Sequence, residues 1–192
     1  MGYLIGSISF AVILSRAFGL PDPRSYGSGN PGATNVLRTG KRAAAALTLI
    51  GDTGKGWIAV YLAQRFASDY GVGEAGIAGV ALAAFLGHLF PLYFRFQGGK
   101  GVATALGILL SVNAWLGLAV LATWIAVAAI FRYSSLAALT AALLAPVYSV
   151  WLIGVDAMTA AAAAMSLLLI WRHRANLQRL LAGQEGKIGK RE

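Results

Sequence analysis

The sequence predicts an all-α, polytopic membrane protein that forms a single domain over residues 1–192, and composition is the first observation behind that prediction. Of the 192 residues, 58% are hydrophobic and only 12% are charged, and the mean hydropathy is +0.68. A soluble domain usually carries about a quarter charged residues, and a chain this short cannot bury so much apolar side chain in one water-facing core. Lipid is therefore the solvent that fits this composition.

The charge and the rarer residues exclude several classes of protein. The net charge is +9, but the basic residues are grouped between apolar segments, so topology and lipid headgroups explain them better than nucleic acid does. The chain has no cysteine and only two histidines. Disulfides, thiolate nucleophiles and cysteine-ligated metals are excluded, and two histidines alone do not predict a zinc site. Membrane lipids are the expected surroundings.

The first apolar segment, Met1–Leu14, is shorter than the roughly 20 residues that a membrane-spanning helix needs. It lacks the basic start and the cleavage site of a signal peptide, so we interpret it as a short first membrane helix. Either further residues precede Met1 in the native protein or this helix is only partly inserted.

The later apolar segments run about Ala43–Ala63, Ala75–Phe94, Val102–Phe131, Leu136–Ile153 and Ala157–Trp171. The segment Val102–Phe131 has about 30 residues, which is too long for one ordinary span and short for two. It contains a polar break, "SVN", that ends at Asn113. A turn there divides the segment into two short spans, about Val102–Leu110 and Ala114–Phe131.

The distribution of basic residues favours this division. Arginine and lysine gather in Arg16–Arg42, Arg95–Lys100, at Arg132 and in Arg172–Arg191. Seven spans place all four groups on one side of the membrane, whereas six leave the basic C-terminal tail on the other. The positive-inside rule therefore predicts seven transmembrane helices, the first one short, with the N-terminus outside and the C-terminus cytoplasmic.

Two glycine-rich, basic loops then face the same aqueous phase. The first is "GSGNPGATNVLR", in which glycine lets backbone N–H groups approach an anion closely while hydroxyl, amide and guanidinium groups add further donors. Its candidate anion-binding residues are Gly27, Ser28, Gly29, Asn30, Gly32, Thr34, Asn35 and Arg38. A plain turn-rich loop is the alternative, although these residues include almost no ordinary surface filler.

The second loop, "GGKGVATALG", places Lys100 after Gly98 and Gly99 at a predicted helix start. It is not a Walker A motif, because Lys100 is followed by Gly101 instead of Ser or Thr, and "GDTGKGW" fails for the same reason. A P-loop NTPase is therefore excluded. The alternative to phosphate binding is a lysine that only marks a membrane boundary.

His173 lies between two arginines at the last membrane boundary, so it should resist protonation and be neutral near pH 7. It is then able to exchange a hydrogen bond with a substrate, although an interfacial anchor explains the segment equally well. Ser135 is a weaker candidate. Asp52 and Lys55, one helical turn apart, are expected to neutralise each other and position a helix.

Covalent catalysis is not expected. The chain has no G-x-S-x-G elbow, and His88 is followed by "LFPLYF", which lacks the H-x₄-D signature of other acyltransferases. If acyl transfer takes place here, it should proceed directly from an activated donor.

Five motifs carry a family resemblance that covers the chain from end to end and in order. They are "GSGNPGATNVLR", "GD" with "KGW" after it, "GHLFPLYFRFQGGKGVATALG", "RYSSLAAL" and "WRHRANLQRLLAGQE". In these motifs the chain resembles the bacterial membrane acyl-phosphate:glycerol-3-phosphate acyltransferase family (PlsY). The resemblance implies a seven-helix inner-membrane enzyme, with a cytoplasmic active site, that transfers a fatty acyl group from acyl phosphate to the 1-hydroxyl of sn-glycerol 3-phosphate. The products are lysophosphatidic acid and phosphate, and the resemblance implies no metal, no CoA donor and no other cofactor.

The resemblance also implies roles for individual residues. Ser28, Arg38 and Lys100 would bind the substrate phosphates, and Ser135 and His173 would complete the pocket. His173, Ser28 and Lys100 would take part in catalysis. Supporting contacts would come from Asn30, Asn35, Asn176 and the glycines Gly27, Gly29, Gly98 and Gly99.

Two other functions fit the same loops. A transporter or flippase for an organic phosphate would use them as a binding site, but such proteins often contain inverted repeats, which this sequence does not show. A scaffold anchored in anionic lipid would not require asparagine and glycine at these spacings.

Overall fold

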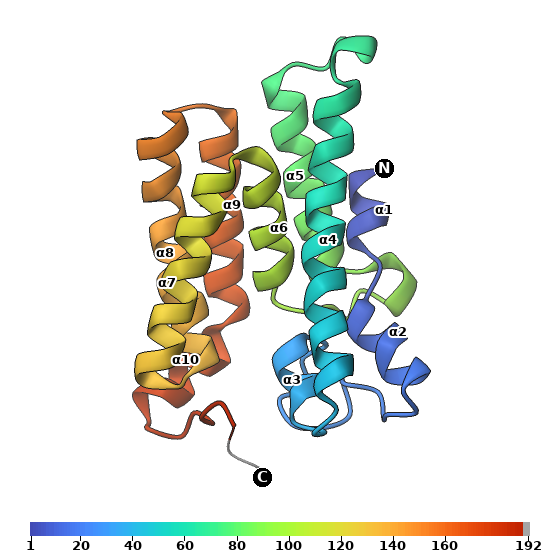
Figure 1. The fold of residues 1–192 in the computed structure, drawn as a ribbon, viewed down its shortest axis with the longest axis vertical. Coiled ribbons are helices and arrows are strands. Elements are labelled where there is room, and N and C mark those ends of the chain that lie inside the picture. Colours follow the sequence, from blue (N-terminus) through green and yellow to red (C-terminus); the bar gives the residue numbers. More distant parts are fainter. Residues whose placement is uncertain (190–192) are drawn as a thin grey trace.

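A computed structural model describes residues 1–189, and within them every regular element is a helix, which confirms the predicted all-α class (Figure 1). In chain order the α-helices are α1 (Gly2–Gly6), α2 (Phe10–Ala17), α3 (Ala33–Leu37), α4 (Arg42–Phe66), α5 (Glu74–Leu89), α6 (Val102–Val112), α7 (Ala114–Phe131), α8 (Ser134–Ile153), α9 (Ala157–Arg172) and α10 (Arg174–Leu181). Two short 3₁₀ turns, η1 (Ser68–Tyr70) and η2 (Leu92–Phe94), flank α5.

The predicted turn at Asn113 is confirmed. α6 ends at Val112 and α7 begins at Ala114, and the Asn113 side chain caps α7 by accepting a hydrogen bond of 3.1 Å from the Leu116 N–H. By length and composition, three stretches of the described chain can cross a membrane: Glu74–Phe94, α7 and α8. α6 and α9 are apolar but shorter. The seven-span topology therefore stays a prediction.

The expected single helix over Met1–Leu14 is wrong, because this segment forms two helices, α1 and α2, separated at Ser7–Ser9. The break is supported by polar contacts. Ser7 Oγ donates to the Tyr3 carbonyl (2.8 Å) and accepts from the Leu92 N–H (3.2 Å), while Lys55 Nζ donates to the Ile8 carbonyl (2.6 Å). An interrupted backbone at membrane depth needs such partners, because lipid supplies none.

Glycines let the central helices approach one another closely. A Cβ added at Gly56 of α4 would overlap the Thr104 carbonyl of α6, and one added at Gly107 of α6 would overlap the Thr53 carbonyl of α4. Small residues at such crossings bring two backbones into van der Waals contact. As a result, α4 packs closely along α6, the helix that follows the second glycine loop.

The loops that carry most of the charge lie toward one end of the bundle. Residues 18–41, the loop before α6, the α7–α8 connection and the chain after α9 are all in the lower half of Figure 1. The α4–α5 and α8–α9 connections lie at the opposite end. Both glycine loops and the tail therefore share one end of the molecule.

Candidate functional site

The first glycine loop is shaped by Asn35. This side chain is 2% exposed, and its Nδ2 donates to the carbonyls of Pro23 (2.7 Å) and Tyr26 (3.2 Å), while its Oδ1 accepts from the Ser28 N–H (3.0 Å). Gly27 has φ +54°, and an added Cβ there would overlap Asn35 Oδ1. Asn35 thus holds the turn that exposes Ser28 to solvent. Its predicted contact with substrate stays a prediction, because its amide already makes three bonds within the loop.

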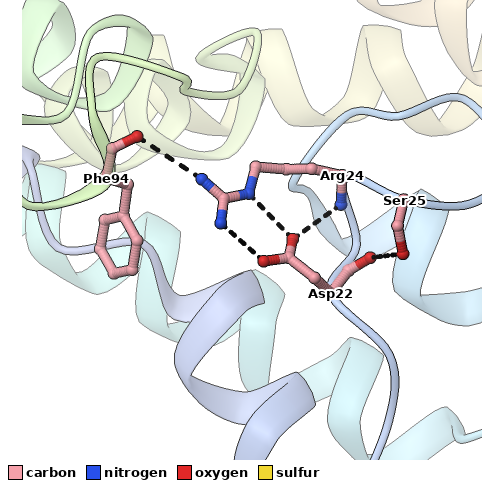
Figure 2. Close-up of polar contacts among 4 residues, drawn as sticks. All are labelled: Asp22, Arg24, Ser25 and Phe94. Atoms are coloured by element: carbon pink, nitrogen blue, oxygen red, sulfur yellow. Dashed lines mark hydrogen bonds and ion pairs between the residues drawn. The ribbon is translucent and has the colours of Figure 1, made fainter.

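An ion pair anchors the same loop to the neighbouring elements (Figure 2). The Arg24 guanidinium donates to both carboxylate oxygens of Asp22 (2.9 and 2.6 Å) and to the Phe94 carbonyl of η2 (3.5 Å). Hydrogen bonds from Arg24 lower the pKa of the Asp22 carboxyl, with burial opposing them. On the other side, Thr34 Oγ1 lies 3.2 Å from Ser134 Oγ at the start of α8. The first loop is therefore fixed between η2 and α8.

The second glycine loop is held by Arg172. Its guanidinium donates to the carbonyls of Gly98 (2.8 Å) and Gly99 (3.2 Å), and the Gly99 N–H donates to the His88 carbonyl (3.1 Å). A Cβ at Gly99 would overlap His88 Nε2 and lie 3.1 Å from the Pro31 carbonyl of the first loop. The two glycine loops therefore meet at Gly99. Both Gly98 and Gly99 are buried by packing, and their predicted role toward substrate is untested by these contacts.

Beside this junction is a hydrogen-bonded group of four side chains, the end cluster, made of Lys100, Ser135, Asn176 and Glu185. Lys100 Nζ donates to Asn176 Oδ1, and Asn176 Nδ2 donates to Glu185 Oε1 (2.6 Å). Ser135 Oγ donates to the same oxygen (2.7 Å), and Arg179 Nε donates to Glu185 Oε2 (2.8 Å). Three predicted site residues from the second loop, α8 and α10 are thus joined through one carboxylate.

The electrostatics of the end cluster follow from partial burial among cations. The pKa of Lys100 is lowered to about 8, mainly by burial; Glu185 opposes the shift, and Arg179, Arg172 and Arg38 add to it. Burial alone would raise the pKa of the Glu185 carboxyl, but hydrogen bonds from Ser135, Asn176 and Arg179 outweigh burial and lower it. Arg38 of the first loop is therefore close enough to Lys100 to act on it. Ser28 and Asn30 belong to the first loop, whose Pro31 carbonyl lies next to Gly99, and their predicted contact with substrate stays a prediction.

His173 stands at the end of α9, next to this cluster, and is 3% exposed. Its Nδ1 lies 2.8 Å from the Leu169 carbonyl. Because a carbonyl only accepts, Nδ1 carries the hydrogen and Nε2 is left as an acceptor. Burial lowers the pKa of His173 to about 4; the Leu169 hydrogen bond opposes the shift and Lys100 adds to it. The low pKa agrees with the expected neutral histidine, but its main cause is burial and not the flanking arginines. A catalytic role for Nε2 stays a prediction.

A second polar group, the inner cluster, lies between the helices and consists of Asp52, Lys55, His88 and Thr104. Lys55 Nζ is 2.8 Å from Asp52 Oδ1, and both residues are 3% exposed. His88 Nδ1 lies 3.0 Å from Thr104 Oγ1 and 3.8 Å from Asp52 Oδ1. The predicted mutual neutralisation of Asp52 and Lys55 is confirmed, and the Lys55 contact with the Ile8 carbonyl shows that it also fixes the α1–α2 break.

An apolar cavity lies between α6, α7, α8 and α9, with an empty volume of about 380 Å³ that includes space open to the surroundings. Its lining consists of Val102, Ala105, Leu106, Leu109, Val120, Ala138, Ala141, Ala142, Ala145, Ala162, Met165, Ser166 and Leu169. Within residues 1–189, no group of three histidine, cysteine or acidic side chains could hold a metal ion.

Sequence reasoning missed Glu185, Arg172 and Arg179 as parts of this site. The chain has only seven acidic residues, and one of them, Glu185, falls inside a strongly basic tail. That isolation was a usable signal, since a carboxylate among cations is usually paired. No comparable signal distinguished Arg172 from the other basic residues at the membrane boundary.

The fold and site define a helical integral membrane protein with a cation-rich end next to an apolar cavity. A family model described as glycerol-3-phosphate acyltransferase matches residues 1–183. The chain belongs to the glycerol-3-phosphate acyltransferase family, a family of enzymes. This membership confirms the resemblance in the five motifs and does not favour a transporter.

Individual relatives agree over nearly the whole chain. Proteins named glycerol-3-phosphate acyltransferase from Ralstonia nicotianae and Thiobacillus denitrificans are 64% and 61% identical to it, over 99% and 98% of this chain and 92% and 94% of theirs. A crystal structure of PlsY (YgiH), an integral membrane glycerol 3-phosphate acyltransferase in its glycerol 3-phosphate form, is 36% identical with a TM-score of 0.90. That comparison covers 98% of this chain and 92% of the other, and the lysophosphatidic acid form of PlsY gives a TM-score of 0.88.

Proposed function

We propose that the protein transfers a fatty acyl group from acyl phosphate to the 1-hydroxyl of sn-glycerol 3-phosphate, forming lysophosphatidic acid and inorganic phosphate. The observation that carries the proposal is the meeting of Lys100, Asn176, Ser135 and His173 at one end of the bundle, directly next to the apolar cavity. Such a site suits a reaction that joins a phosphate-bearing alcohol to a lipid chain.

The two glycine loops would bind the phosphates. Lys100 and Arg38 supply positive charge, and Ser28 with the backbone N–H groups of its loop supplies neutral donors. Asn176 contributes by orienting Lys100, because its Oδ1 accepts from that ammonium group and its Nδ2 is fixed by Glu185. Asn30, Gly29 and Gly98 belong to the same loops and are proposed as supporting contacts.

The chemistry needs no acyl-enzyme, because acyl phosphate is a mixed anhydride with a good leaving group. The 1-hydroxyl oxygen attacks the acyl carbonyl carbon, the bond to the phosphate oxygen breaks, and the hydroxyl proton passes to His173 Nε2 or to a phosphate oxygen. Ser135 donates its hydroxyl hydrogen to Glu185, so its oxygen is left to accept from the glycerol hydroxyl. Holding the two substrates in contact supplies roughly 7–11 kcal/mol of the barrier reduction.

The acyl tail would occupy the cavity between α6, α7, α8 and α9, which adjoins the end cluster. We further propose that the chain crosses the inner membrane seven times, with the N-terminus outside and the active site facing the cytoplasm. The grouping of the basic loops at one end of the bundle supports this orientation. Large apolar side chains on the outer helix faces, such as Ile130 and Trp151, support contact with lipid.

The test is a transfer assay with purified protein in detergent, acyl phosphate and glycerol 3-phosphate. Release of phosphate should match formation of lysophosphatidic acid. Replacing Lys100 by Ala should lower kcat/KM by about 10²–10³-fold or more while the protein stays folded, whereas Lys41→Ala, at an exposed lysine of the same end, should have little effect. Uptake of organic phosphate into vesicles without acyl transfer would contradict the proposed reaction.

A further inference from the structure

The apolar cavity is aligned with the reactive groups on three helices. Lys100 precedes the lining residue Val102 of α6, Ser135 lies one turn before Ala138 of α8, and His173 follows Leu169 of α9 by one turn. The Leu169 carbonyl even accepts the His173 Nδ1 hydrogen. The end of the cavity nearest the end cluster therefore lies at the position where an acyl carbonyl would react.

The opposite end of the cavity is formed by four side chains, Leu109, Val120, Ala145 and Ala162, which we call the cavity floor. Each is the lining residue of its helix farthest from the end cluster. Their positions follow from the directions of the helices, since α6 and α8 run away from the end cluster while α7 and α9 run toward it (Figure 1).

Hydrogen bonds close the bundle immediately beyond the floor. Ser149 Oγ, one turn after Ala145, lies 2.8 Å from Thr159 Oγ1, which also donates to the Gly154 carbonyl (2.7 Å). On the end-cluster side of Val120, Thr123 Oγ1 lies 3.0 Å from Tyr148 Oη and joins α7 to α8 along the cavity. Separating these groups in apolar surroundings would leave polar atoms unsatisfied, so the floor resists displacement by a longer ligand.

The cavity exists because α8 contributes only alanines to it, at Ala138, Ala141, Ala142 and Ala145. On the opposite side, α6 contributes larger groups that include Leu106 and Leu109. A side chain of ordinary size at any of the alanine positions would fill the space. The capacity of the cavity therefore depends on a few small residues.

We propose that the cavity floor, and above all Ala145, Ala162 and Leu109, sets the longest acyl chain that the enzyme transfers efficiently. This inference rests on the proposed acyl transfer. A chain whose methyl end reaches the floor fills the cavity, whereas a longer chain must bend or displace its carbonyl carbon from the reactive groups. Enlarging a floor alanine shortens the accepted chain, and trimming Leu109 lengthens it.

The experiment measures kcat/KM for a series of saturated acyl phosphates of increasing length, with glycerol 3-phosphate as acceptor. Ala162→Leu should lower the ratio of long-chain to short-chain kcat/KM by about tenfold or more, since single methylene differences in apolar pockets give effects of this order. The KM for glycerol 3-phosphate should not change. Ala160→Leu is the matched control, because Ala160 is exposed on the same helix.

Leu109→Ala supplies the opposite test and does not depend on overfilling the core. It should raise the relative kcat/KM of chains longer than the wild-type optimum. Equal loss at all lengths in Ala162→Leu and no change in Leu109→Ala would overturn the inference, as would the same shift in Ala160→Leu. Wild-type protein that transfers no acyl group at all would instead contradict the proposed function.

Discussion

The inner cluster and the end cluster contain the same kinds of side chain but differ in their roles. The inner cluster and the end cluster each hold one lysine, one carboxylate and a hydroxyl, with a histidine in or next to the group. In the inner cluster, Lys55 contacts Asp52 and the Ile8 carbonyl, so its charge is matched within the bundle. At the end cluster, the single carboxylate of Glu185 accepts from Arg179, and the charges of Arg172, Arg179 and Arg38 all act on Lys100.

The difference shows how the same residue types are divided between structure and binding. A buried pair of opposite charges on one helix has no net charge, so it has little capacity for another ion. Cations that outnumber the nearby carboxylate at a solvent-facing end favour an incoming anion. Local charge balance, more than residue type, therefore separates the structural cluster from the binding one.

The largest effect should come from replacing His173, the histidine next to the end cluster. His173→Gln removes the Nε2 acceptor beside the end cluster, so kcat should fall by about 10²–10⁴-fold. Transfer kinetics with saturating acyl phosphate measure this change, and the KM for glycerol 3-phosphate should move little.

His88→Gln is the matched variant in the inner cluster. It should lower the thermal stability in detergent and leave the kcat of the folded fraction close to wild type, since His88 contacts Thr104 inside the bundle. An equal loss of kcat in both variants would remove the distinction between the clusters.

The next largest effect concerns the inner ion pair. Lys55→Met leaves Asp52 buried without its partner, and removing one member of such a pair destabilises a protein by about 3–5 kcal/mol. Chemical or thermal unfolding in detergent gives the loss. The double variant Asp52→Leu with Lys55→Met should recover part of it, because neither charge is left alone. A double variant less stable than Lys55→Met would contradict mutual neutralisation.

The sequence alone was enough for most helix positions and for the Asp52–Lys55 pair. Both depend on local features: apolar length, the polar break at Asn113, and side chains one turn apart on one helix. The break between α1 and α2 was missed because its partners, Leu92 and Lys55, come from distant segments. Backbone groups that are satisfied by remote residues leave no local signal.

The sequence predicted which residues come together in the candidate site better than it predicted the contacts between them. Lys100, Ser135, His173 and Asn176 were all expected near one another, and the structure joins or couples them. The link itself, Glu185, lies 50 residues from Ser135 along the chain and was not expected. Asn35 likewise contacts backbone carbonyls that become its neighbours only after the loop has folded. Such contacts depend on tertiary arrangement, which spacing in the sequence does not encode.

A smaller effect should follow from Glu185→Gln. The change keeps the size of the side chain but places an amide beside donors from Asn176, Ser135 and Arg179, so one hydrogen bond to a charged group is lost. Such bonds contribute about 1.5–3 kcal/mol, which corresponds to a fall in kcat/KM of roughly 10–100-fold. Glu74→Gln, at an exposed position in the first turn of α5, is the control and should behave as wild type.

The smallest effect, about tenfold per pH unit, is the alkaline limb of the wild-type pH profile. Lys100 must be protonated to bind phosphate, and its pKa in the free enzyme is about 8, so kcat/KM should decline as the pH rises above 8. Bound phosphate favours the charged amine and raises this pKa, so kcat should persist to higher pH than kcat/KM. Because the pKa of His173 is about 4, no limb near pH 6.5 should come from this histidine.

Two variants connect this limb to the end cluster. Glu185 raises the pKa of Lys100, so Glu185→Gln should move the decline in kcat/KM below pH 8. In Lys100→Arg, the guanidinium stays charged throughout, and any activity that remains should lose the limb. If the decline in kcat/KM at high pH were unchanged in both variants, a group other than Lys100 would limit the reaction there. The excess of positive charge at the end cluster would then not be what binds the substrate. A limb that moves in Glu185→Gln but not in Lys55→Met would show that the inner cluster is electrostatically separate from catalysis.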